Sequence, residues 1–322
     1  MSKLGYFIRL VRLPNLIMIL FVQYMVRFAF LYPIFKISGL RLQLNEGIFF
    51  LFSIAFVCMA AGGYIINDYY DVEIDKINKP DRMIIGKGYT LAEALELYWV
   101  VSLTGVVIGF WSCYEMGLPA LGVLFFIYLS GLWYYATTLK YMVLVGNILV
   151  SLFLALVPFT VGLVELFADK KESALGTDFI FPLSSYKAVI VISVFAFLVN
   201  LARELVKDAE DMEGDAKAGC RTVPIIWGLK TTKTLVTLSL VCIMCALGKY
   251  SLRLFGEGDW LSLGYIIAFV LVPILIILIG LFMASTPKEF HRISTWLKWL
   301  MVSGISYLFV FTFILLSYYD VE

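Results

Sequence analysis

Long apolar stretches alternate with short polar connections along most of the chain. Each stretch is close to the roughly 20 residues that a helix needs to cross a bilayer, and a helix satisfies its own backbone in lipid. We therefore predict an all-α, polytopic membrane protein with about nine transmembrane helices around a central cavity. The predicted spans are residues 14–35, 45–66, 91–113, 117–138, 142–165, 186–205, 231–250, 262–284 and 294–318.

Composition supports a membrane protein and excludes other classes. Hydrophobic residues make up 61% of the chain and charged residues 15%, whereas about 25% of a soluble domain is charged. With a net charge of +1, nothing indicates a nucleic-acid partner, and no obligate protein partner is predicted. The single histidine, His291, argues against an imidazole-based zinc site or a Ser-His-Asp triad. We expect no cleavable signal peptide, because the first span is too long and lacks a small-residue cleavage site.

The distribution of Lys and Arg predicts the orientation. Most of these residues fall in the connections on the side of the N-terminus, which the positive-inside rule places in the cytoplasm. We expect the cell membrane as the location, with the N-terminus inside and the C-terminus outside. Segment 166–184 is then an outer loop. Arg27 is exceptional because it lies inside the first span, where it either snorkels to the outer face or faces the cavity.

Two acidic stretches on the cytoplasmic side share one spacing. Both read D-x-x-D-x-x-x-D, and one constant offset maps each Asp of the first onto an Asp of the second. The first set is Asn67, Asp68, Asp71 and Asp75; the second is Asp208, Asp211 and Asp215. Residues three and four apart share a helix face, so each set forms an acidic stripe whose like charges repel unless a cation binds.

Mg²⁺ with a phosphorylated ligand is the partner that such stripes fit best. Magnesium prefers carboxylate oxygens and keeps phosphate oxygens in its coordination. We predict that all seven residues of the two sets are metal ligands. Diphosphate needs further positive charge. The basic candidates to bind it are Arg82, Lys140, Lys207 and Arg221.

The constant offset also indicates an internal duplication. We predict one membrane domain, residues 1–322, containing two pseudo-repeats at 1–140 and 141–285. Parallel repeats place equivalent loops on the same membrane side, so the two stripes can face one another.

Several segments resemble one family. The first acidic stretch followed by Asn78-Lys79-Pro80-Asp81-Arg82 resembles the first motif of the UbiA-type intramembrane prenyltransferases. The second stretch, with Arg221-Thr222-Val223-Pro224 after it, resembles their second motif. Arg12-Leu13-Pro14-Asn15 is similar to the opening of their first helix. The run from Tyr135 to Lys140 followed by Val145-Gly146-Asn147 is similar to their junction between the fourth and fifth helices.

The resemblance implies Mg²⁺-dependent transfer of an isoprenyl group from a prenyl diphosphate to a lipophilic acceptor. It implies that metals and basic residues stabilise the departing diphosphate and that an acceptor attacks an allylic carbocation. Asp68, Asp71, Asp211 and Lys140 are the expected catalytic residues, and Asp68 is either a base or a metal ligand. Arg12 and Asn15 are expected to bind the acceptor, with Lys3 and Arg9 nearby.

The second motif reduces the number of candidate acceptors. Its Lys-Asp-x-Glu-Asp-x-x-Gly-Asp pattern looks most like the digeranylgeranylglyceryl phosphate synthases, so the best hypothesis is geranylgeranyl transfer to geranylgeranylglyceryl phosphate. An aromatic quinone precursor or a tetrapyrrole, of the homogentisate, naphthoate or chlorophyllide type, is the alternative. A transporter is a remote third hypothesis, because it too has buried acids and repeats.

Overall fold

The protein is helical throughout the part that the computed structural model describes, which is residues 2–39, 41–78, 83–167 and 180–318. Within these ranges nine helices are long and apolar enough to span a membrane, and the only β-pairing is an isolated bridge between Ile85 and Tyr89. The predicted all-α fold with nine spans is therefore confirmed. The spans are Leu13–Ile37, Glu46–Tyr70, Leu91–Glu115, Pro119–Thr137, Val145–Phe167, Ser185–Glu210, Gly228–Glu257, Trp260–Met283 and Pro287–Ser317.

Several helices extend beyond the apolar stretch that predicted them, since a helix can continue into water with polar residues. The elements of the first half are α1 (Lys3–Leu10), α2 (Leu13–Tyr24), the π-helix η1 (Met25–Leu31), α3 (Tyr32–Ile37), α4 (Glu46–Tyr70), α5 (Val72–Asn78), α6 (Leu91–Glu115), η3 (Pro119–Gly122), α7 (Val123–Thr137) and η4 (Leu139–Tyr141). Those of the second half are α8 (Val145–Phe167), α9 (Ile180–Glu210), α10 (Met212–Lys217), α11 (Val223–Ile226), α12 (Gly228–Glu257), α13 (Trp260–Ile266), the π-helix η6 (Ile267–Leu271), α14 (Val272–Met283) and α15 (Pro287–Tyr318).

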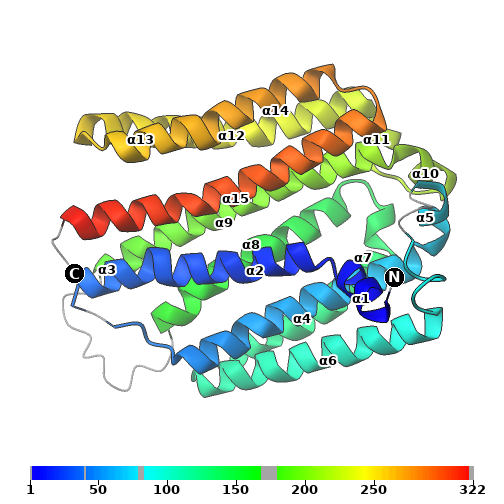
Figure 1. Ribbon diagram of the computed structural model, residues 1–322, viewed down its shortest axis with the longest axis horizontal. Helices are drawn as coiled ribbons and strands as arrows, with labels where there is room; N and C mark the ends of the chain where they lie inside the picture. The colour runs from blue at the N-terminus through cyan, green and yellow to red at the C-terminus, as the bar shows by residue number, and fades with distance from the viewer. Residues whose placement is uncertain (1, 40, 79–82, 168–179, 319–322) are drawn as a thin grey trace.

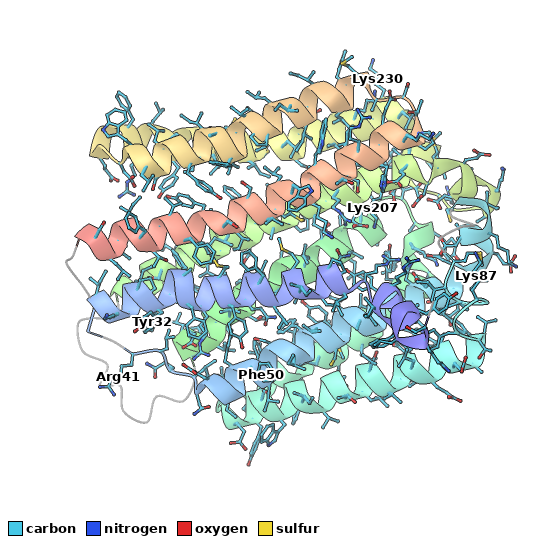
Figure 2. The ribbon with its side chains drawn as sticks, viewed as in Figure 1. Tyr32, Arg41, Phe50, Lys87, Lys207 and Lys230 are labelled. Carbon is cyan, nitrogen blue, oxygen red and sulfur yellow. The ribbon has the colours of Figure 1, made fainter. Side chains whose placement is uncertain are left out.

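The long helices run side by side (Figure 1). The short helices α1, α5, α10 and α11 lie toward one end, whereas α3, α13 and the last turn of α15 lie at the opposite end. Lys87, Lys207 and Lys230 lie toward the first of these ends, and Arg41 lies at the other (Figure 2). The acidic segments, most of the cations and the first helix therefore share one end, as the orientation prediction requires.

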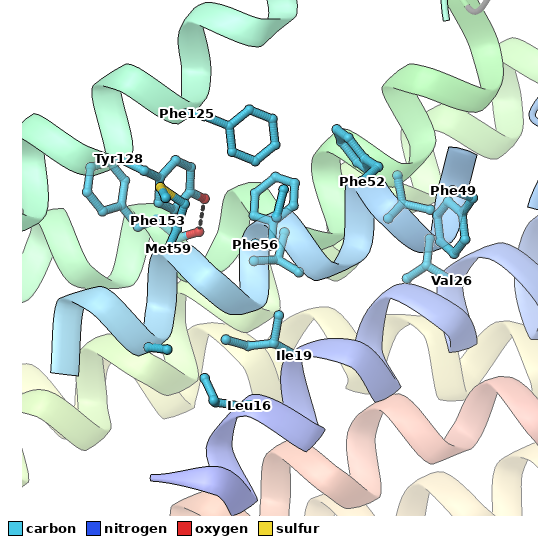
Figure 3. Close-up of a cluster of buried hydrophobic side chains, with 14 of the residues drawn as sticks. Leu16, Ile19, Val26, Phe49, Phe52, Phe56, Met59, Phe125, Tyr128 and Phe153 are labelled. Atoms are coloured by element: carbon cyan, nitrogen blue, oxygen red, sulfur yellow. Dashed lines mark hydrogen bonds between the residues drawn. The ribbon is translucent and has the colours of Figure 1, made fainter. Parts of the chain in front are cut away.

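Small residues bring α4 and α6 into close contact. A Cβ at Gly62 on α4 would lie 2.1 Å from Ser102 Oγ, and one at Gly105 on α6 would lie 2.7 Å from Cys58 Cβ. Small residues allow backbones to approach closely in membranes, where packing rather than water drives helix association. Next to this seam Phe52, Phe56 and Phe125 form a buried aromatic cluster (Figure 3).

Two prolines inside spans leave backbone carbonyls that accept hydrogen bonds from α15. Pro33 and Pro273 have no N–H, so the carbonyls four residues earlier, Ala29 and Phe269, lose their helical partners. Both carbonyls accept a hydrogen bond from a hydroxyl of α15: Thr312 donates to Ala29 and Ser303 to Phe269. A π-helical stretch precedes each proline. These two bonds connect α15 to spans near both ends of the chain.

Arg27 neither snorkels outward nor faces an open space. Its side chain is 1% exposed, and its Nε lies 2.7 Å from Oε1 of the equally buried Glu165 on α8. Arg27 also donates to the Leu44 carbonyl at 2.5 Å, and Glu165 accepts from the Gln43 N–H at 2.8 Å. Both predicted alternatives for Arg27 are therefore wrong. The pairing with Glu165 was not predicted because no local sequence pattern links the two residues.

Candidate active site

Both acidic stretches break their helices at the central aspartate. Asp71 separates α4 from α5 with φ −90° and ψ 3°, and Asp211 separates α9 from α10 with φ −93° and ψ 5°. The same two backbone hydrogen bonds are made around each break. In the first, the Asp71 N–H donates to the Asn67 carbonyl at 2.9 Å and the Asp75 N–H to the Asp71 carbonyl at 2.8 Å. In the second, the Asp211 N–H donates to the Lys207 carbonyl at 2.9 Å and the Asp215 N–H to the Asp211 carbonyl at 3.1 Å. The chain therefore forms the same acidic turn twice.

The spans before these turns also begin alike. Arg12 and Leu144 are the two described non-glycine residues with positive φ, at 52° and 65°, and they directly precede α2 and α8. The third residue of each helix is an asparagine. Asn15 donates to Tyr64 Oη at 3.2 Å, and Asn147 donates to Asp208 at 2.9 Å. These parallels support the predicted duplication, which stays a prediction.

Two cations hold the first turn. Arg12 Nη2 lies 2.8 Å from Asp68 Oδ1, and Lys140 makes an ion pair with Asp71. Asn67 also donates to Asp71, at 2.6 Å. The Lys140 side chain is only 8% exposed, so its charge is directed at this turn rather than at bulk water.

Arg12 is positioned by backbone and ring together. Its left-handed conformation is one that few non-glycine residues adopt, and its guanidinium lies 4.7 Å from the centre of the Tyr64 ring. Burial on its own lowers the pKa of Arg12, but the negative charge of Asp68 and the Tyr64 phenol outweigh it and raise that pKa above the usual value. Arg12 is therefore a permanent cation beside the first turn.

The second turn is preceded by a buried carboxylate. Glu204 on α9 accepts from Lys207 at 2.9 Å and from Arg203 at 3.2 Å. Lys207, predicted to bind diphosphate, is thus one turn away from Asp211 and paired with Glu204. The sequence analysis missed Glu204 and Arg203, although ionisable residues inside an apolar stretch were a usable signal.

The fold brings the two turns together. α5 and α10 contact one another. The charges of Asp71, Asp208 and Glu204 all act on the phenol of Tyr135 at the end of α7. Tyr135 is therefore near both halves of the site, a role that was not predicted although Tyr135 begins the junction that resembles the family.

Cys220 lies between the same groups. Burial is the main cause that raises the pKa of the Cys220 thiol, to about 12. The charges of Asp215, Lys140 and Asp71 also act on this thiol. The thiol is therefore neutral at physiological pH and is unsuited to act as a thiolate nucleophile.

The remaining predicted residues are Arg221, Arg82, Lys3 and Arg9. Arg221 is exposed, and its backbone N–H donates to the Tyr141 carbonyl at 3.1 Å, which connects the second motif to η4. Arg82 lies outside the described residues. Lys3 pairs with Glu93 on α6 at 2.6 Å and is 64% exposed, and Arg9 is exposed, so neither joins Arg12 in a cluster.

The donor set fits a hard divalent cation. Six carboxylates and Asn67 supply oxygen ligands from two turns in contact, which suits Mg²⁺ better than softer metals. Among the described residues, no three acidic, Cys or His side chains are already clustered tightly enough to hold a metal ion. Three of the carboxylates, those of Asp68, Asp71 and Asp208, are instead paired with Arg12, Lys140 and Asn147, so their coordination to a metal requires these pairs to open.

The sequence of the chain identifies the family. Residues 39–302 match the model of the UbiA prenyltransferase family. The chain belongs to the UbiA prenyltransferase family. Members of this family are membrane prenyltransferases, so the predictions of an enzyme and of a multi-pass membrane protein are confirmed. The transporter hypothesis is wrong.

Curated UbiA-family relatives carry one name. The chain is 32% identical over 235 residues to digeranylgeranylglyceryl phosphate synthase of Methanoculleus marisnigri, covering 72% of this chain and 73% of that one. It is 33% identical over 249 residues to the enzyme of the same name from Methanobrevibacter smithii, covering 76% and 79%.

Solved structures share the UbiA fold. A digeranylgeranylglyceryl phosphate synthase structure superposes with a TM-score of 0.57 at 22% identity, covering 97% of this chain and 99% of that one. A UbiA homologue from Aeropyrum pernix K1 gives 0.56 at 15% identity, covering 91% and 96%. One from Archaeoglobus fulgidus, bound to GPP and Mg²⁺, gives 0.51 at 14%, covering 94% and 99%.

Proposed function

We propose that this prenyltransferase moves a geranylgeranyl group from geranylgeranyl diphosphate to the free hydroxyl of geranylgeranylglyceryl phosphate. In this reaction the bond between the allylic carbon and the diphosphate oxygen breaks. An ether bond forms to the glycerol oxygen, the hydroxyl proton is released, and diphosphate leaves. The observation that carries the acceptor assignment is the similarity, at 32–33% identity over more than two thirds of the chain, to relatives named for this product.

Two acidic turns in contact support the donor side of the proposal. Asn67, Asp68, Asp71, Asp75, Asp208, Asp211 and Asp215 would hold Mg²⁺. When bound, the metal supplies positive charge that neutralises the diphosphate and improves it as a leaving group.

The protein's own cations complete the neutralisation. Lys140, now paired with Asp71, can turn from that carboxylate to a phosphate oxygen without leaving the site. Arg82 and Arg221 are proposed to contact the diphosphate, and Lys207 to support it while paired with Glu204. Tyr135, near the same charges, is proposed to stabilise a developing allylic cation through a cation–π contact with its ring.

The ion pair with Arg12 bears on whether Asp68 acts as a base or as a metal ligand. A carboxylate that already accepts a charge-assisted hydrogen bond from Arg12 is stabilised in its ionised form and is a weaker base. This favours a metal-ligand role for Asp68, and the departing diphosphate would accept the hydroxyl proton of the acceptor.

The proposed orientation places this site at the cytoplasmic face of the cell membrane. The two turns, α1 and most of the basic connections lie at one end of the molecule (Figure 1), which is the arrangement that the positive-inside rule favours. The water-soluble diphosphate would then leave into the cytoplasm while both prenyl chains stay in the bilayer. The enclosed cavity for those chains stays a prediction.

The acceptor is tested by competition. Purified protein is given geranylgeranyl diphosphate, Mg²⁺ and an equimolar mixture of geranylgeranylglyceryl phosphate, 4-hydroxybenzoate, homogentisate and dihydroxynaphthoate. We expect a product with two prenyl chains on glycerol phosphate, detected by mass. A prenylated aromatic product with none on glycerol would contradict the acceptor assignment but not the prenyltransferase assignment.

A further inference from the structure

Lys298 is a cation within a membrane span, far in sequence from both acidic turns. It lies on α15, and Nζ donates to Asn15 Oδ1 at 2.8 Å. With a rise of about 1.5 Å per residue, the helix places it roughly 16 Å from the start of α15 at Pro287. A lysine within a span is costly without a function or an anionic partner.

The ammonium group has no carboxylate partner in the part of the chain that is described, where none lies within 4 Å. Its one described hydrogen bond goes to a neutral amide, and an ammonium carries three donors. Two donors are therefore left for another acceptor. Unlike Lys140, this residue is not neutralised by the site as it stands.

A second cation lies on α9, the helix that packs against α15. Arg203 on α9 is close enough for its positive charge to repel that of Lys298. Among the described residues, the buried Nε of Arg203 has no hydrogen-bond partner, and Nη1 donates to the adjacent Glu204 at 3.2 Å. Glu204 is shared with Lys207, so one carboxylate is divided between two cations.

Lys298 and Arg203 are the cations here that the neighbouring carboxylates serve least. Arg12 is paired with Asp68, and Lys207 with Glu204. The remaining nearby carboxylate, Asp208, accepts from Asn147 and interacts with Lys207. Lys298 bonds only the neutral amide of Asn15 among the described residues, and Arg203 shares Glu204 with Lys207. A phosphate monoester, which carries about −1.5 to −2 charges near pH 7, can accept hydrogen bonds from both cations.

We infer that Lys298 and Arg203, with Asn15, form a second anion site that binds the phosphate monoester of the acceptor. The inference rests on the proposed function for the identity of the acceptor. Asn15 lies one turn from Arg12 and bonds Tyr64 on α4, so the site adjoins the first acidic turn. The two turns keep their own cation in Lys140. Donor and acceptor phosphates are thus held by different lysines, on α15 and after α7.

The test compares how a substitution at Lys298 changes the KM for the acceptor with how it changes the KM for the prenyl diphosphate. Lys298→Met keeps the length of the side chain and removes its charge, and Lys298→Arg keeps the charge. The matched control is Lys288→Met, on the exposed first turn of the same helix. We expect Lys298→Met to raise the KM for geranylgeranylglyceryl phosphate about 10- to 100-fold, as for loss of a charge-assisted hydrogen bond. The KM for geranylgeranyl diphosphate should change by less than about twofold, and Lys298→Arg should recover most of the loss.

A phosphate-free acceptor tests the chemistry directly. The parent should prefer geranylgeranylglyceryl phosphate over geranylgeranylglycerol, and Lys298→Met should lose most of that preference. An unchanged acceptor KM in Lys298→Met would overturn the inference. An equal rise in the donor KM would also overturn it, by assigning the site to the diphosphate.

A binding measurement separates this inference from the proposed function. Glycerol 1-phosphate should raise the thermal unfolding midpoint of the detergent-solubilised parent and of Lys288→Met, but not of Lys298→Met. If the parent prenylates an aromatic acceptor while this difference persists, the proposed function fails and the anion site stands. If the parent shows no stabilisation, the anion site fails whatever the acceptor is.

Discussion

At the scale of single residues, the site is a set of ion pairs that must exchange partners. Asp68 and Asp71 are paired with Arg12 and Lys140, so their negative charges are compensated although their side chains are only 15% and 17% exposed. A metal that arrives with a diphosphate offers both partners a replacement, since the metal takes the carboxylates and the phosphate oxygens take the cations. The pairs therefore prepare charged groups for binding without leaving them buried and uncompensated.

We predict that both turns are needed for turnover. Asp71→Asn and Asp211→Asn keep the side-chain shape and should each lower kcat/KM at saturating Mg²⁺ by about 100-fold or more, because each removes an anionic metal ligand. The measurement is product formation by mass in detergent.

The chain offers matched controls for these variants. Glu73 and Glu213 stand two residues after Asp71 and Asp211, are exposed, and form ion pairs with Lys76 and Lys217 on their own short helices. Glu73→Gln and Glu213→Gln should keep at least half of the parent activity. Near-normal activity in Asp71→Asn or Asp211→Asn would contradict a site made from two turns.

Sequence reasoning reached part of this residue-level arrangement. The aspartates and Lys140 were found because spacing and charge are local properties that recur in a recognisable pattern. Tyr135 and Asn147 belong to the junction that resembles the family, but neither was predicted as a site residue, because their interactions with Asp208 and the other carboxylates come from different helices. Glu204 was not predicted either, although it is a carboxylate in an apolar stretch and pairs with Arg203 and Lys207 of its own helix.

At the scale of elements, α15 acts as a partner for two interrupted helices. Pro33 and Pro273 free the carbonyls of Ala29 and Phe269, and hydroxyls of α15 bond both. An unsatisfied carbonyl in lipid is expensive, so each hydroxyl stabilises the kinked helix as well as its contact. The same helix carries Lys298, so these bonds also fix the position of the proposed phosphate site.

We expect removal of these hydroxyls to weaken the attachment of α15. Thr312→Val and Ser303→Ala should each lower the free energy of unfolding by about 0.5–1.5 kcal/mol, the range of a net hydrogen bond. The loss should be measured by thermal or denaturant unfolding in detergent. Thr295→Val is the control, since its exposed hydroxyl bonds the His291 carbonyl of its own helix. A loss in Thr295→Val equal to the other two would assign the effect to helix propensity instead.

At the scale of the whole molecule, the number and order of spans followed from the length of apolar runs, which is a local property. The contacts that set one span against another did not follow. Lys298 meets Asn15 across nearly the entire chain, and Arg27 meets Glu165 although each alone looks like an exception in an apolar stretch. Pairing of distant single residues leaves no periodicity to detect, so these contacts required the fold.

The Arg27–Glu165 pair ties the two predicted halves together at the end away from the acidic turns. Arg27 belongs to the first span and Glu165 to the fifth, and both bond the connection at Gln43 and Leu44. The guanidinium also lies 4.2 Å from the centre of the Phe49 ring. The pair is therefore a single buried link among three segments.

We predict that removing one charge of the Arg27–Glu165 pair lowers the free energy of unfolding more than removing both charges. Arg27→Met leaves the Glu165 carboxylate buried without its cation and should lower the free energy of unfolding by about 3–5 kcal/mol. Arg27→Met combined with Glu165→Gln removes both charges, and the new amide oxygen can still accept from the Gln43 N–H, so the double variant should be more stable than Arg27→Met alone. Unfolding midpoints of the parent, both single variants and the double variant in one detergent measure this coupling. If the losses in the two single variants simply add in the double variant, the pair is not coupled and the link between the halves must lie in other contacts.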